Sequence, residues 1–201
     1  MLKDNYVFDY QDYTSQIVGW WGNPAVSMPA APRVLEAENG VRFLTAGRPI
    51  PGLGAAPNSL IALSSWRPYP VPAGVQIPVG IRCSQLWLLL QNYVHVLKNY
   101  VVNGEVLLHY ADGSQSVEPL VPPYNLDCYF QHFSRKGLIV PLGGVSLGGG
   151  WSFIYTGNLL AHADALPIVC DPGKVLESVE IRATCSEGVI GLVGMTVQKA
   201  K

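Results

Sequence analysis

The sequence predicts an all-β protein, an antiparallel β-sandwich built from short strands. The chain of 201 residues contains 21 glycines and 16 prolines, which separate short runs rich in branched and aromatic side chains. Such runs with turn residues between them are typical of sandwiches and barrels. No segment shows four turns of a clean amphipathic helical period. We expect one domain over residues 1–201, because sandwiches commonly reach this length as single units.

The expected strands lie within the apolar runs of the chain. These runs are VRFLTAG (Val41–Gly47), SLIALSSW (Ser59–Trp66), VQIPVG (Val75–Gly80), SQLWLLLQNYV (Ser84–Val94), GEVLLHYADGSQSVEPL (Gly104–Leu120), LESVEIRAT (Leu176–Thr184) and VIGLVGMTVQKA (Val189–Ala200). The clearest unit is Gly104–Leu120, where Asp112-Gly113 joins two runs and predicts a β-hairpin. Residues 90–101 have helical spacing as well, but their valines and the neighbouring strands favour a strand that runs into a loop.

Three segments are expected to be irregular. Residues 1–40, which include the proline-rich stretch Trp20–Gly40, are expected to wrap the sheet as an arm. Ala46–Asn58 is expected to be a second long loop. Leu142–Trp151 is rich in glycine and does not match a phosphate-binding loop, so we expect a flexible loop there.

Composition and charge exclude several classes of partner. Hydrophobic residues make up 49% of the chain and charged residues 13%, which allows a large buried core and argues against disorder. The net charge is -1 and no run of Lys or Arg occurs, so nucleic acid is not an expected partner. The longest apolar run, Leu86–Leu90, is too short to span a membrane. The first ten residues lack the apolar region of a signal peptide.

The four cysteines, Cys83, Cys128, Cys170 and Cys185, are too far apart in the sequence for a CxxC metal site. Each lies in an apolar or strand-like context, which predicts buried free thiols. The alternative is a disulfide between Cys170 and Cys185, if a hairpin aligns them.

The stretch PPYNLDCYFQHFS, Pro122–Ser134, is the strongest candidate for a binding face. Read with period two, one face carries Asn125, Asp127, Tyr129, Gln131 and Phe133, and the other carries Leu126, Cys128, Phe130 and His132. The second set predicts a core face and the first an outward polar face. Amides and carboxylates bind paired hydroxyls and rings cover the apolar face of a sugar, so this face suits a neutral polyol. The alternative is an ordinary solvent-facing strand.

Aromatic residues in or beside predicted loops offer further platforms for a ligand. Loops at one end of a sandwich carry most of its binding sites, although tryptophan in a small β-domain is often core. The aromatic residues in such positions are Trp20, Trp21, Trp66, Tyr69, Tyr124 and Trp151.

No motif identifies an enzyme. The sequence has no GxSxG elbow, HExxH pair or Walker loop. His162 and Asp164 are two residues apart and can point the same way on a strand, but local spacing supplies no third metal ligand. Carboxylates for glycoside hydrolysis are available at Asp112, Asp127, Asp164 and Glu187, of which Asp112 and Glu187 are better explained by turns. We therefore expect no catalytic residues, no metal site and no cofactor.

The hairpin and the last two strands also carry a family resemblance. GEVLLHYADGSQSVEPL has a Y-x-DGS turn and a return strand, LESVEIRA has the form L-x-S-V-x-I-R-A, and GLVGMTV has the form G-L-x-x-M-T-V. Together these resemble the galactose-binding-like β-sandwich (jelly-roll) accessory domains of bacterial polysaccharide-degrading proteins, over about Val75–Gln198. The resemblance implies a jelly-roll fold, a secreted or periplasmic location and a catalytic domain as neighbour or partner chain. Many such domains bind glycans at loops on one end and hold a structural calcium, but no acidic cluster here clearly reproduces a calcium site.

The sequence thus predicts a non-catalytic module that binds an oligo- or polysaccharide or otherwise assists glycan degradation. The first alternative is a purely structural or interaction domain that supports a catalytic neighbour, and the second is a small hydrolase or lyase. The candidate carbohydrate-binding residues are Trp66, Tyr69, Tyr124, Asn125, Asp127, Tyr129, Gln131, Trp151, His162 and Asp164.

Overall fold

The computed structural model describes residues 7–9, 34–44, 59–66, 71–94, 98–127, 136–145, 159–186 and 188–200. These residues form an all-β structure in which every strand pairing is antiparallel. None of them belongs to a helix long and apolar enough to cross a bilayer. The strands are β1 (Val7–Asp9), β2 (Val34–Glu36), β3 (Arg42–Leu44), β4 (Ser59–Leu63), β5 (Gly74–Val94), β6 (Gly104–Tyr110), β7 (Gln115–Leu120), β8 (Leu138–Val145), β9 (Leu159–Val169), β10 (Val175–Ala183) and β11 (Gly188–Lys199).

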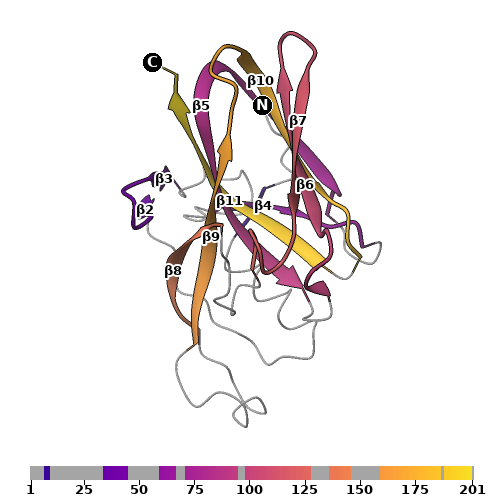
Figure 1. Cartoon of the computed structure of the whole chain (residues 1–201). Coiled ribbons are helices and arrows are strands. Elements are labelled where there is room, and N and C mark those ends of the chain that lie inside the picture. The colour runs from indigo at the N-terminus through magenta and orange to yellow at the C-terminus, as the bar shows by residue number, and fades with distance from the viewer. Residues whose placement is uncertain are drawn as a thin grey trace.

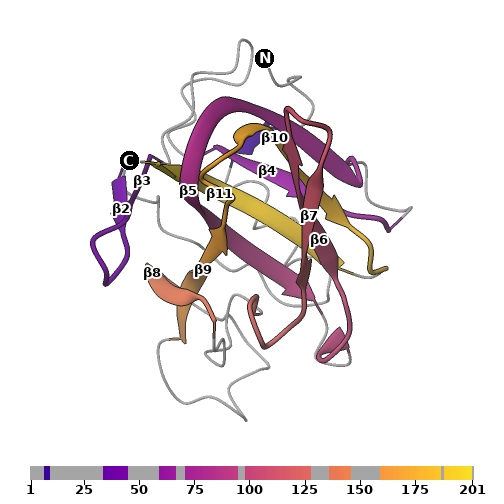
Figure 2. The same cartoon turned by 45° about the horizontal axis from the view of Figure 1, so that its top comes forward.

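Strand β5 belongs to both layers of the sandwich. Its first half pairs with β10, which continues through β6 to β7 and completes the first layer. Its second half pairs with β11 on one side and β9 on the other, and the second layer runs β1-β4-β11-β5-β9-β8. Figures 1 and 2 show β5 as an arch that passes from one layer into the other. Strands that switch sheets in this way form the corners of β-sandwiches.

The arch replaces a turn that the sequence predicts. We expected Val75–Gly80 and Ser84–Val94 to be separate strands, but they are parts of one continuous strand. Leu176 and Ser178 of β10 pair with Ile81 and Pro78 of β5, so β5 has one extra residue in this stretch. Gly80 lies within it and has a φ of 71°. Glycine tolerates this left-handed conformation, so a β-bulge bends the strand without ending it.

The core lies between the two layers. Period-two alternation directs Leu86, Leu88 and Leu90 of β5 inward, where they are fully buried in one cluster with Leu108 of β6 and Ile181 of β10. Leu126 belongs to the same cluster, as its place in the apolar set of Pro122–Ser134 predicts. The all-β sandwich expected from the sequence is confirmed.

The predicted hairpin and the last two strands are also confirmed. β6 and β7 pair across a turn in which Gly113 has a φ of 83° and its N–H donates to the Tyr110 carbonyl at 2.9 Å. β10 alternates as expected except at its bulge, where Ser178 and Val179 are both buried. β11 covers the last predicted run, Val189–Ala200, except for its final residue.

Two expectations about irregular segments are wrong in part. Residues 142–145 of the glycine-rich segment belong to β8, and β8 and β9 pair with each other although neither was among the expected strands. β1 and β2 lie within the expected arm; β1 extends the second layer by pairing with β4, and β2 forms a hairpin with β3. Such short strands are set by their partners more than by their own sequence. Residues 1–6, 10–33 and 146–151 lie outside the described residues.

The cysteines that the structure describes are free. Cys83 and Cys170 are buried, as expected, whereas Cys185 is only half-buried. The alternative disulfide between Cys170 and Cys185 is absent because β10 runs between these two residues. Nine extended residues span about 30 Å, far beyond the reach of a disulfide. Cys128 lies outside the described residues.

Candidate functional site

Two loops meet at the end of the first layer where β6 begins and β7 ends. Residues 98–103 precede β6 and residues 121–127 follow β7. The Tyr100 N–H donates to the Pro122 carbonyl at 2.6 Å, and the Asn103 N–H donates to the Leu120 carbonyl at 2.8 Å. The Asn103 carbonyl in turn accepts from Thr184, just beyond β10, at 2.9 Å. These bonds fix three chain segments side by side, and we call this region the loop end.

The loop end presents a patch of exposed apolar surface. Tyr100 is 82% exposed and Tyr124 is 56% exposed, and Val101 and Val102 are exposed beside Tyr100 in the sequence. Tyr100 has a φ of 64°, a conformation that costs a residue with a side chain about 1–2 kcal/mol. Strained residues of this kind cluster at ligand sites. We call Tyr100, Val101, Val102 and Tyr124 the loop patch.

Two buried asparagines hold the loops in place. The Asn125 Oδ1 accepts from the Val121 N–H at 2.8 Å, and its Nδ2 donates to Glu118 Oε1 at 2.9 Å and to the Pro119 carbonyl at 2.7 Å. The Asn103 Nδ2 donates to the carbonyls of Lys98 and Val101, both at 2.9 Å. These asparagines give buried backbone groups the partners that they need.

A groove of about 440 Å³ lies at the same end of the layer, where β10 ends beside the beginning of β5. The register pairs Arg182 with Gly74 on one side and with Glu105, the second residue of β6, on the other. The groove is lined by Ala73, Gly74, Val75, Gln76, Glu180, Arg182, Ala183 and Thr184. It therefore offers an amide, a carboxylate, a guanidinium and a hydroxyl next to the loop that contains Tyr100.

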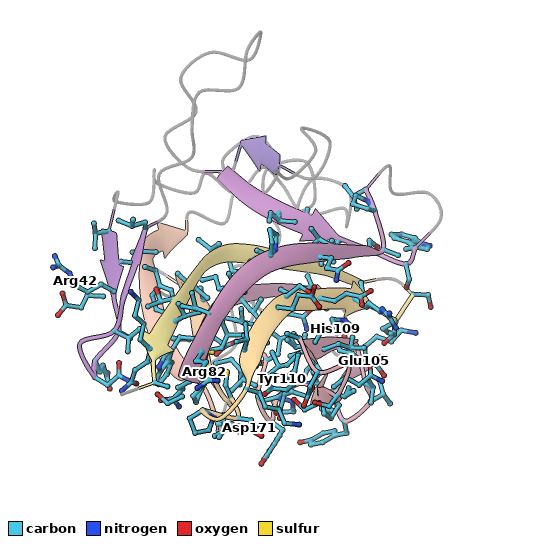
Figure 3. The ribbon with its side chains drawn as sticks, turned by 90° about the horizontal axis from the view of Figure 1, so that it is seen from above. Arg42, Arg82, Glu105, His109, Tyr110 and Asp171 are labelled. Carbon is cyan, nitrogen blue, oxygen red and sulfur yellow. The ribbon has the colours of Figure 1, made fainter. Side chains whose placement is uncertain are left out.

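The charged groups of the groove are paired with each other. The Arg182 Nε and Nη2 donate to the two Glu180 oxygens at 2.6 and 2.9 Å, and His109 Nε2 lies 3.0 Å from Glu180 Oε2. Hydrogen bonding from Arg182 is the main reason that the pKa of Glu180 is lowered, and His109 adds to it against the opposing effect of burial. Figure 3 shows His109 and Glu105 on the same side of the molecule, away from Arg42. The groove is thus polar without a large excess of one charge.

The predicted outward face of Pro122–Ser134 is wrong where the structure describes it. Residues 122–125 form a turn, so period two does not apply to them. Asn125 and Asp127 are each only 1% exposed, because Asn125 closes the turn and the Asp127 N–H donates to Asp164 Oδ2 at 2.7 Å. Of the candidates in this stretch, Tyr124 alone is exposed among the described residues. Tyr129 and Gln131 lie outside the described residues.

Of the remaining candidates, the structure describes the side chains of Trp66 and Asp164. Trp66 is half-buried just after β4, where its N–H donates to Ser64 Oγ at 3.1 Å. Asp164 is fully buried on β9 opposite Leu90, and the backbone of His162 lies two residues before it on the same strand. The side chain of His162 and the whole of Tyr69 and Trp151 lie outside the described residues.

The structure brings together two of the four carboxylates considered for glycoside hydrolysis. Asp127 and Asp164 are neighbours, but both are buried, so neither is open to a glycan. Asp112 lies on the exposed β6–β7 turn, and Glu187 lies outside the described residues. Within the described ranges, no group of three His, Cys, Asp or Glu side chains is arranged to hold a metal ion.

Sequence reasoning missed Tyr100, Gln76 and Arg182. The available signal for Tyr100 was an aromatic residue inside the turn-prone stretch KNYVVNG between two strands. Gln76 and Arg182 come together only through the pairing of β5 with β10, which no local pattern reveals. In comparisons with known proteins, no family model and no curated protein sequence matches the chain.

Proposed function

We propose that this chain is a non-catalytic carbohydrate-binding module that recognises an oligo- or polysaccharide at the loop patch and the adjoining groove. The observation that carries the proposal is the pair of exposed rings, Tyr100 and Tyr124, on two loops joined by a backbone hydrogen bond. Tyrosine rings can cover the apolar face of a sugar, and amide, carboxylate and guanidinium groups bind its hydroxyls. The strained backbone of Tyr100 fits a residue kept for binding rather than for stability.

The charges of the groove favour a neutral glycan. The Glu180 carboxylate accepts hydrogen bonds from both the Nε and the Nη2 of Arg182. Glu105 lies opposite Arg182 on β6. An acidic sugar would have to compete with these carboxylates for one guanidinium. A shallow site with one or two stacked rings suggests micromolar to millimolar affinity, roughly -8 to -4 kcal/mol.

The resemblance to accessory domains of polysaccharide-degrading proteins supports the same role. Such domains usually lie beside a glycan-active catalytic domain in a secreted or periplasmic protein, and we propose the same setting for this chain. Many of those domains bind glycans at loops on one end of the sandwich, and the loop patch lies at such an end here. We propose in addition that the sandwich is a jelly roll of the galactose-binding-like type.

The test is a glycan array of neutral and acidic polysaccharides, followed by calorimetry with the glycan that binds. Tyr100→Ala and Tyr124→Ala should each weaken binding about 5–10-fold, and the double variant should abolish it, since each stacked ring contributes about 1 kcal/mol. Leu44→Ala is the matched control, because Leu44 is an equally exposed apolar residue on β3 and its removal should leave affinity unchanged. Absence of binding to every glycan, or wild-type affinity in the double variant, would disprove the proposal.

A second function is favoured by the valines of the loop patch. Val101 and Val102 extend the exposed surface with aliphatic groups, which suit a protein neighbour better than a sugar. If the chain instead docks onto a catalytic domain, Val101→Ser/Val102→Ser should weaken that association in ultracentrifugation. In the carbohydrate proposal the same change leaves most of the glycan affinity, because the two rings remain.

A further inference from the structure

Two buried cysteines lie where the second layer is joined to the arch of β5. Cys83 lies on β5 at the point where the strand passes between the layers, and Cys170 directly follows β9. Cys83 is 0% exposed and Cys170 is 2% exposed, and both belong to the single core cluster. Their thiols therefore face the same interior.

The strand register places these cysteines next to each other. Val169 pairs with Gln85, and the Cys170 N–H donates to the Ser84 carbonyl at 3.1 Å. Cys170 therefore lies opposite Ser84, the residue next to Cys83. Opposite residues are about 5.5 Å apart and successive residues rise about 3.3 Å, which puts the two Cα atoms about 6 Å apart. Disulfides join Cα atoms separated by about 4.4–6.8 Å.

Both side chains also enter the same core cluster. Gln198 and Lys199 are consecutive on β11, but they pair with Gln85 and Cys83 of β5, so Ser84 is an extra residue on β5. This bulge shifts the alternation of inward and outward side chains along β5. Cys83 thereby joins Leu86 on the inner face. Burial is the main cause that raises the pKa of Cys170 to about 12, and a hydrogen bond with the Cys83 side chain adds to it.

We propose that Cys83 and Cys170 are a latent cross-strand pair, which forms a disulfide between β5 and β9 when the chain folds in the presence of a low-molecular-weight disulfide. The structure describes the reduced form, in which both are free thiols. This inference is independent of the carbohydrate proposal.

The reaction is two successive thiol–disulfide exchanges. The thiolate of one cysteine attacks a sulfur of the small disulfide, which breaks its S–S bond, forms a mixed disulfide and releases one thiolate. The second cysteine thiolate then attacks the protein sulfur of the mixed disulfide and releases the other small thiolate. Two protein thiols are oxidised, one small disulfide is reduced to two thiols, and the two protons pass to the released sulfurs.

The folded protein protects the pair from this reaction. Only thiolates attack disulfides, and burial of both thiols keeps the small disulfide away from them. The raised pKa of Cys170 also leaves this residue mostly as the thiol. Oxidation is therefore expected during folding, or after the end of β9 opens at the exposed Val169. The linkage would close a loop of about 90 residues that contains Tyr100 and Tyr124, and such long loops gain the most from cross-linking.

The test compares refolding with labelling of the native protein. The full chain is denatured with reductant and refolded with and without a mixture of reduced and oxidised glutathione. With oxidised glutathione we expect a mass loss of about 2 Da, a Cys83–Cys170 linked peptide and a midpoint of thermal unfolding higher by about 5–10 °C. Cys185→Ser should behave like the wild type, because Cys185 lies at the far end of β10.

A second measurement guards against variants that fail to fold. In native reduced wild-type protein, an aromatic disulfide reagent should modify Cys185 rapidly and modify Cys83 and Cys170 only after denaturation. Absence of the Cys83–Cys170 peptide after oxidative refolding, a different linkage, or a lower unfolding midpoint in the linked form would each overturn the proposal.

Discussion

The two ends of the first layer use tyrosine in opposite ways. At the end formed by the β6–β7 turn, the Tyr110 ring is buried and its hydroxyl accepts from the Asp171 N–H at 3.0 Å. Lys174 Nζ lies 5.6 Å from the centre of that ring and 2.9 Å from Asp112 Oδ2. Figure 3 shows Tyr110 and Asp171 together at this end. We call it the turn end.

At the loop end the rings of Tyr100 and Tyr124 are exposed, while buried amides hold the backbone beneath them. At the turn end the ring and the hydroxyl of Tyr110 therefore both have partners within the protein. The loop end places its polar groups inside and its aromatic surface outside, which is the arrangement that a binding surface needs. The difference predicts that mutations at the loop end affect stability and binding more than matched mutations at the turn end.

The largest contrast is expected between two glycines. A Cβ at Gly104, the first residue of β6, would lie 2.5 Å from the Arg182 carbonyl oxygen and 2.5 Å from Ile190 Cδ1, whereas a Cβ at Gly113 meets nothing within 4 Å. Gly104→Ala should cost about 3 kcal/mol of unfolding free energy through overpacking. Gly113→Ala should cost about 1 kcal/mol, through its positive φ alone. Urea denaturation of both variants measures the contrast, and equal losses would contradict it.

The next contrast concerns polar side chains. Asn125→Ala removes three part-buried hydrogen bonds, to the Val121 N–H, the Glu118 carboxylate and the Pro119 carbonyl, so we expect a loss of about 2 kcal/mol. Asp112→Ala at the turn end removes only exposed contacts with Lys174 and Ser114, and should have a much smaller effect. Chemical denaturation gives both values, and Asn125→Ala should also weaken glycan binding by releasing Tyr124. A loss for Asp112→Ala as large as that for Asn125→Ala would refute this reading.

The ion pair of the groove predicts a pH dependence. The pKa of Glu180 is lowered in the folded state, so its contribution to stability is present above its ordinary pKa of 4.5 and is lost as the pH falls through the lower folded value. Glu180→Gln should cost about 1 kcal/mol at pH 7 and should make stability fall less steeply below pH 4.5. Urea midpoints from pH 7 to pH 3 test this, with Glu177→Gln at an exposed position of β10 as control. An unchanged slope in Glu180→Gln would count against the ion pair.

The smallest expected effect separates stability from binding at Tyr100. Tyr100→Gly relieves the φ of 64° and should stabilise the fold by about 0.5–1 kcal/mol, whereas Tyr100→Ala retains the strain. Both variants lose the ring and should bind the glycan equally weakly. Thermal unfolding and calorimetry of the pair measure the two effects. A glycine variant that is no more stable than the alanine variant would mean that Tyr100 carries no backbone strain.

The sequence alone determined the parts of this protein whose signals are local. The β6–β7 hairpin, β10 and β11 follow from period-two alternation and from an Asp-Gly turn, which act between residues close in the chain. The position of Tyr124 beside a predicted loop also indicated a surface residue, and its side chain is exposed. Its role in binding stays a prediction. Composition was enough to indicate an all-β chain with a large core.

Tertiary structure alone decided which polar groups are buried and which surfaces meet. Asn125 and Asp127 are inside because Val121, Pro119 and Asp164 provide their partners, and a polar side chain is buried when such partners exist. Gln76 meets Glu180 and Cys83 meets Cys170 through pairing between distant strands. These contacts depend on register, which the whole sheet sets, so no local pattern in the chain contains them.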